Sequence, residues 1–153
     1  MIGHTPPPEY DKKQNAARLR EGLENHIRFV SEKAVNKHGR PNSMGVLSQM
    51  LEDNEIVRFP TSILFADGEL KEGEPIKLNK IGEGQDERYQ IIVHPIFERR
   101  EKDIIALVLH EVVKVNYGKI AKEKESLLFA SSLLGMEEEA YQSRIKELFS
   151  EIS

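Results

Sequence analysis

Apolar residues along the first quarter of the chain recur at every third or fourth position. From Glu9 or Asp11 to about Lys37, this spacing predicts one long amphipathic helix with a single buried stripe. Gly39 and Pro41 are expected to end the helix, because both residue types interrupt helical backbone. The stripe comprises Ala16, Leu19, Leu23, Ile27, Val30 and Ala34.

A second, shorter helix and then a group of strands are predicted next. Asn42 or Ser43 is expected to cap a helix that continues to about Leu51, since either side chain can accept a hydrogen bond from the first turn. Beyond it, short stretches rich in β-branched and aromatic residues are bounded by turn residues, which is typical of strands. The predicted strands cover residues 59–65, 75–79 and 88–94.

From about residue 98 the chain is predicted to be helical to its end. The segment 100–117 is apolar on nearly all sides, which is typical of a buried helix. Further helices are expected over 120–134 and 137–151, the last with Ala140, Ile145, Leu148 and Phe149 turned inward. These elements predict an α+β fold, in which a small three-stranded sheet packs against about five helices. Residues 1–8, with three consecutive prolines, are expected to form a flexible arm, and residues 9–153 a single domain.

Composition and charge narrow the classes of function. The 153 residues carry a net charge of −4, which gives no basic surface for nucleic acid, and they include no cysteine. The lack of cysteine excludes disulfides, thiol catalysis and Cys-ligated zinc, and it fits a cytoplasmic protein. The first residues lack the apolar core of a signal peptide, and the longest apolar run, 104–109, is too short to span a membrane. We therefore expect neither a nucleic acid nor a membrane as partner.

Three polar residues interrupt the apolar helix predicted over 100–117. His110, Glu111 and Lys114 share one face of this helix, because residues three and four apart are neighbours on a helix surface. A buried charge must be paired or bound to something. The expected partner is Glu125, on the next helix, which a short turn makes antiparallel.

This arrangement resembles a known family of metallopeptidases. The segment HEVVK, from His110 to Lys114, departs only at its last position from the His-Glu-x-x-His motif of zinc peptidases. The segment ESLLFASSLL, which begins at Glu125, resembles the Glu-x-x-x-Phe-Ala-x-x-Leu-Leu helix of the ImmA/IrrE-type small zinc peptidases. The order of parts over residues 15–135 is also similar to that family. The resemblance implies a zincin-like fold.

The resemblance also implies a role for each residue of the motif. His110 matches the first zinc ligand, Glu111 the general base and Glu125 the third ligand, whereas Lys114 stands where the second histidine belongs. Catalytic zinc needs three protein ligands and an open site. A protonated lysine repels a dication. The repulsion costs about 4 kcal/mol for each pair of unit charges that lie about 4 Å apart at an effective dielectric constant of about 20.

The departure at Lys114 leads to a hypothesis for function. Lys114 is expected to occupy the place of the metal, with its ammonium paired to Glu111 and Glu125. The protein would then be a non-catalytic, metallopeptidase-like protein that holds no cofactor and binds a protein or peptide partner. An extended partner segment is expected to add to the edge of the sheet, at the strand over 75–79 or the strand over 88–94.

Three alternatives stay open on the sequence. The first is a metal-dependent hydrolase, in which His94 or another residue completes a zinc site, Glu111 is the base and Tyr117 an oxyanion donor. The second is a structural helical interaction protein, whose long first helix is the contact face and in which a homodimer is plausible. In the third, His110 and Glu111 are ordinary residues of a buried helix.

Overall fold

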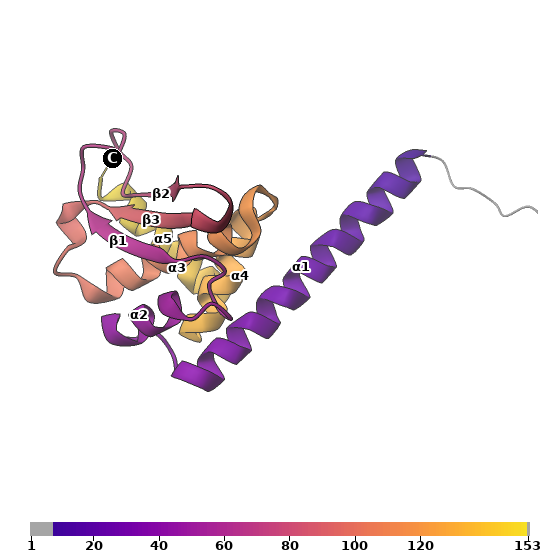
Figure 1. The fold of residues 1–153 in the computed structure, drawn as a ribbon, viewed down its shortest axis with the longest axis horizontal. Helices are drawn as coiled ribbons and strands as arrows, with labels where there is room; N and C mark the ends of the chain where they lie inside the picture. Colours follow the sequence, from indigo (N-terminus) through magenta and orange to yellow (C-terminus); the bar gives the residue numbers. More distant parts are fainter. Residues whose placement is uncertain (1–7, 153) are drawn as a thin grey trace, which may run out of the picture.

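The computed structural model describes residues 8–152, and over these residues it confirms the mixed α+β class. Five α-helices accompany one small sheet of three strands (Figure 1). The expected arm over 1–8 lies outside the described residues, except for Pro8, which begins the first helix. The elements are α1 (Pro8–His38), α2 (Met44–Glu52), β1 (Thr61–Phe65), β2 (Ile76–Ile81), β3 (Arg88–Val93), α3 (Glu101–Tyr117), α4 (Glu123–Leu134) and α5 (Glu138–Ser150).

The sheet has the order β1-β3-β2 and mixes the two kinds of pairing. β3 is parallel to β1, with Ile63 opposite Ile91, and antiparallel to β2, with Leu78 opposite Ile91. Residues directly opposite each other place their side chains on the same face, so Ile63, Leu78 and Ile91 all point to one face. This face belongs to the hydrophobic core. The strand over 88–94 was expected as a possible edge, but β3 is central, and the edges are β1 and β2.

Helix α3 is largely buried, as its sequence predicts. Residues 104–113 are all buried, and the helix packs against β2 and β3 as well as α4 and α5. Acidic residues in its first turn, Glu101 and Asp103, complement the helix dipole. It ends at Gly118, whose φ of 62° few other residues adopt. Helix α3 thus holds its polar residues in the middle of the protein.

Helix α1 extends beyond the rest of the molecule at its N-terminal end (Figure 1). It packs against α4, which spans about 18 Å, whereas α1 spans about 46 Å at 1.5 Å per residue. The expected single buried stripe is therefore only partly right. The stripe is buried from Leu23 to Ala34, but Ala16 is exposed and Leu19 is 54% exposed. No described element lies opposite these two residues, because α4 begins beside Arg20 and Glu24.

Helix α5 covers α3 and α4 with a different set of residues from the one expected. Ile145 and Leu148 are buried as predicted, and Phe149 is half-buried, but Ala140 is exposed and its neighbour Tyr141 is fully buried. The Tyr141 hydroxyl donates a 2.6 Å hydrogen bond to the carbonyl of Ala106 in α3. Among the described helices, none is both long and apolar enough to cross a membrane.

Candidate functional site

The polar residues of α3 form one cluster with the first turn of α4. His110 and Glu111 are both buried, 4% and 5% exposed, and the other buried residues of this helix are apolar. The turn over 118–122 folds α4 back against α3 and brings Glu123 to His110. The cluster therefore consists of His110, Glu111, Lys114 and Glu123.

His110 lies between two carboxylates. Its Nδ1 is 2.7 Å from an oxygen of Glu111, and its Nε2 is 2.8 and 3.0 Å from the two oxygens of Glu123. Burial by itself lowers the pKa of His110, but the hydrogen bonds and charges of Glu111 and then Glu123 outweigh it and raise the pKa above its ordinary value. A charged imidazole with a carboxylate on each nitrogen is the state that this geometry favours.

Lys114 also binds the carboxylate of Glu111. Its Nζ is 3.2 and 3.3 Å from the two oxygens of Glu111, one turn earlier on the helix. Burial raises the pKa of Glu111, but the hydrogen bond from His110 and the charge of Lys114 outweigh burial and lower that pKa. Glu111 is therefore held as a carboxylate by two cationic groups.

Glu125 does not join this cluster, in contrast to the expectation that it pairs with Lys114. Its carboxylate, 1% exposed, accepts hydrogen bonds from the guanidinium of Arg20 in α1 and, at 2.8 Å, from the backbone N–H of Lys122. Successive residues of a helix are rotated by about 100°, so Glu123 and Glu125 point in nearly opposite directions. Glu123 thus points to α3 and Glu125 to α1.

Sequence reasoning missed both Glu123 and Arg20. The only signal for Glu123 was its place in the first turn of α4, two residues before the glutamate that the family pattern marks. Arg20 gave no signal, since its contact with Glu125 joins residues 105 positions apart.

The other residues considered for an active site lie in different surroundings. His94 follows β3, and its Nδ1 accepts a 3.1 Å hydrogen bond from the backbone N–H of Ile96, so the side chain caps a local turn. Tyr117 bonds through its hydroxyl to Nδ1 of His26 in α1, at 2.6 Å, and burial raises its pKa to about 12. Neither residue makes a hydrogen bond to the cluster in the described part of the chain.

As they stand, the residues that match zinc ligands do not form a catalytic zinc site. Three positions correspond to zinc ligands of the family. His110 has carboxylates on both ring nitrogens, Glu125 is turned to Arg20, and Lys114, in place of the second histidine, adds a positive charge. Across residues 8–152, no three His, Asp or Glu side chains are placed to hold a metal ion. The donor set thus differs from the three ligands and open position that catalytic zinc requires.

A cleft of about 460 Å³ lies between β2 and the C-terminal end of α3 and reaches the cluster. Strand residues from one wall and Glu111 and Lys114 from the other line it. Because β2 is an edge strand, one side of its backbone is free of β3. The lining residues are Glu74, Ile76, Lys77, Leu78, Lys80, Tyr89, Glu111, Lys114, Gly118, Lys119 and Ala121.

The register shows which backbone groups of β2 face this cleft. The carbonyl of Pro75 accepts a 2.8 Å hydrogen bond from the N–H of His94, so the antiparallel alternation starts at that pair. Every second residue from Pro75 then points its backbone groups toward β3, and the intervening residues point theirs outward. The outward groups belong to Ile76, Leu78 and Lys80, and none of them makes a backbone hydrogen bond elsewhere in the described chain.

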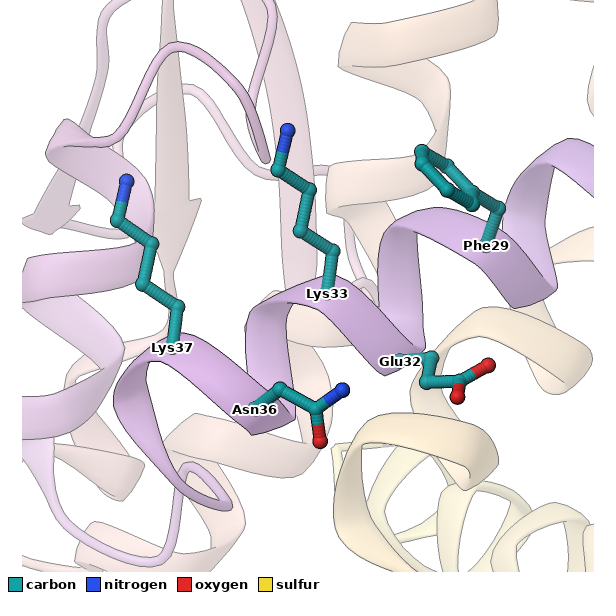
Figure 2. A pocket seen from close by; sticks show the side chains of 5 residues that line it. All are labelled: Phe29, Glu32, Lys33, Asn36 and Lys37. Atoms are coloured by element: carbon teal, nitrogen blue, oxygen red, sulfur yellow. The ribbon is translucent and has the colours of Figure 1, made fainter.

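A larger hollow of about 570 Å³ lies on the outer face of α1, away from the cluster. Figure 2 shows that its lining side chains rise from successive turns of this one helix. Two of them, Lys33 and Lys37, pair with Glu55, at 2.8 and 3.8 Å. The lining residues are Phe29, Glu32, Lys33, Asn36 and Lys37. This hollow is lined by residues of α1 and does not reach the cluster, so we take the cleft beside β2, which Glu111 and Lys114 line, as the candidate site.

No protein-family model, curated protein or solved structure matches this chain. The resemblance to ImmA/IrrE-type peptidases therefore stays a prediction that rests on the motif residues quoted above.

Proposed function

We propose that this protein is a divergent, non-catalytic, metallopeptidase-like protein that binds an extended protein or peptide segment in the cleft between β2 and α3. The observation that carries the proposal is the position of Lys114. Its ammonium lies on Glu111, the residue that matches the general base, at the edge of a cleft whose opposite wall is a free strand edge. The proposal includes the zincin-like arrangement and a cytoplasmic location.

Electrostatics argues against catalysis by Glu111. A general base works best when its pKa lies near the operating pH, and it must be free to take a proton. Here His110 and Lys114 both bind the carboxylate and lower its pKa. A zinc ion beside Lys114 would also meet a positive charge where the family has a neutral ligand.

The strand edge supplies the binding mode. An extended peptide can add to an exposed sheet edge, where main-chain hydrogen bonds give affinity and side-chain pockets give specificity. Leu78 and Lys80 offer outward backbone groups, while their side chains and that of Tyr89 lie on the face of the sheet toward α3. A peptide along β2 would therefore pass directly over Glu111 and Lys114.

Peptide binding to the full chain tests the proposal. The probes are fluorescent, end-blocked octapeptides in which threonine alternates with Glu, Gln or Lys, and the readout is fluorescence anisotropy. We expect at least one peptide to bind, and Leu78→Pro to weaken it by about tenfold, because proline removes an outward N–H without removing a bond to β3.

Ile63→Pro is the matched control for Leu78→Pro. Ile63 is a half-buried residue of the other edge strand, β1, and its N–H also points away from β3, but it lies outside the cleft. Thermal melts followed by circular dichroism check that both variants fold. If no peptide binds, or if both prolines weaken binding equally, the proposed function is wrong.

A further inference from the structure

The cleft beside β2 has a charge opposite to that of the whole protein. Four lysines and two glutamates line it, whereas the chain has a net charge of −4. One of the glutamates, Glu111, is already bound by His110 and Lys114. The surface that remains to meet a partner is therefore cationic.

The lysines differ in how far they are already paired. Lys80 is 3.6 Å from a carboxylate oxygen of Glu87, whereas Lys77 and Lys119 form no ion pair within the part of the chain that the structure describes. Lys114 is 39% exposed and binds Glu111 on one side only, so its ammonium keeps donors for a second carboxylate. Both Lys114 and Lys119 come from the wall opposite β2.

From these observations we infer that the partner segment is an extended acidic peptide with carboxylates at alternating positions. The inference rests on the proposed function, because it needs the peptide to lie as a strand along β2. Side chains of a strand alternate between its two faces, so every second residue of the peptide would face α3. Carboxylates at those positions would meet Lys114 and Lys119. They would also lie near Lys80, whose side chain is on the face of the sheet toward α3.

The strand edge favours a peptide over nucleic acid as the anionic partner. Outward N–H and C=O groups at Leu78 and Lys80 alternate along β2 in the pattern that another strand pairs with. A phosphate backbone has no donors for those carbonyls. The described cleft also shows a single aromatic lining residue, Tyr89, whereas single-stranded nucleic acids are usually held by several stacked aromatic rings.

The test compares peptides of equal length on the full chain by fluorescence anisotropy. The probes are blocked octapeptides of alternating Glu-Thr, Gln-Thr and Lys-Thr, and a Glu-Glu-Thr-Thr repeat that has the same charge as the first but not its alternation. We expect the alternating Glu-Thr peptide to bind at least about tenfold more tightly than the Gln-Thr and Lys-Thr peptides. It should also bind more tightly than the Glu-Glu-Thr-Thr peptide.

Substitutions of single lysines test whether the carboxylates of the peptide bind in the cleft. Lys114→Gln and Lys119→Gln are each expected to weaken binding of the Glu-Thr peptide about two- to fivefold, the range for partly exposed ion pairs. Lys119 is exposed and unpaired within the described residues, so Lys119→Gln stays informative even if Lys114→Gln fails to fold. Lys146→Gln, an exposed position on α5 outside the cleft, should leave binding unchanged.

Each other outcome overturns a defined part of the reasoning. Equal binding of the Glu-Thr and Gln-Thr peptides would overturn the acidic preference and leave the proposed function standing. Equal binding of both acidic repeats, or no effect of Lys114→Gln and Lys119→Gln, would overturn strand-like recognition by these lysines. If an oligothymidylate binds as tightly as the Glu-Thr peptide, the inference of a peptide partner is overturned in favour of a nucleic acid. Binding of none of the peptides would overturn the proposed function as well.

Discussion

Replacing Arg20 by methionine tests how the long helix α1 is joined to the rest of the protein. The guanidinium of Arg20 donates hydrogen bonds to the carboxylate of Glu125 and, at 2.7 Å, to the carbonyl of Ile120. Methionine keeps much of the aliphatic length but removes both donors. The buried carboxylate of Glu125 then keeps one described partner, the backbone N–H of Lys122.

The size of the effect follows from burial on the two sides of this ion pair. Removing one partner of a fully buried pair costs about 3–5 kcal/mol, and a hydrogen bond to a charged group contributes about 1.5–3 kcal/mol. Glu125 is 1% exposed, but the side chain of Arg20 is 38% exposed, so water replaces part of what is lost. We therefore expect Arg20→Met to lower the free energy of unfolding by about 2 kcal/mol, which for a chain of this size corresponds to a Tm about 4–8 °C lower.

Urea denaturation followed by circular dichroism measures this change, with Arg28→Met as the control on the same helix. Arg28 is 58% exposed, and its only described ion pair is a 3.9 Å contact with Glu24, so its replacement should cost less than about 0.5 kcal/mol. The slope of the urea dependence should not change, because the same surface is exposed on unfolding.

A double-mutant cycle with Glu125→Gln separates the pair from other effects of the substitution. Since the two side chains bind each other, their effects should not add, and a coupling free energy of about 1 kcal/mol or more is expected. The reasoning is refuted if Arg20→Met destabilises no more than Arg28→Met. The same holds if the cycle shows no coupling between Arg20 and Glu125.

Three further predictions concern the cluster and the core. Native protein should hold little zinc by elemental analysis, and Lys114→His, which places a second imidazole one turn from His110 and its partner Glu123, should gain about one zinc per chain; stoichiometric zinc in the native protein would instead support the hydrolase alternative. Since the pKa of His110 is raised on folding, its contribution is complete below about pH 6.5 and is lost as pH rises through the raised pKa. The urea midpoint should therefore fall as the pH rises above about 6.5, and His110→Gln should flatten this fall; an unchanged profile would refute it. Tyr141→Phe removes the hydrogen bond to the carbonyl of Ala106 and should cost about 1 kcal/mol in the same assay, whereas a stabilised variant would contradict that account.

Much of the secondary structure could be predicted from the sequence, because its signals are local. The spacing of apolar residues placed the helices to within a few residues, and Ser43 caps α2 as one of the two expected candidates. The nearly continuous apolar run in α3 predicted its burial, which the structure confirms. Each of these features depends on neighbours within one or two helical turns, so the chain itself carries the information.

Sheet order and edges could not be predicted in the same way. The strand over 88–94 has the strongest strand pattern, and that pattern is equally compatible with an edge or a central place. Its partners are β1, far back in the chain, and β2, so its position depends on long-range pairing. That Lys80 and Tyr89 share one face of the sheet also follows from the register and not from the spacing alone.

The sequence by itself determined that His110, Glu111 and Lys114 share one face of a buried helix, because a helix of 3.6 residues per turn leaves no other arrangement. Only the tertiary structure decided their partners. The return of α4 turns Glu123 to His110, and the packing of α1 brings Arg20 to Glu125. Side-chain contacts across elements depend on the rotation of each helix about its axis, and packing of the whole core sets that rotation.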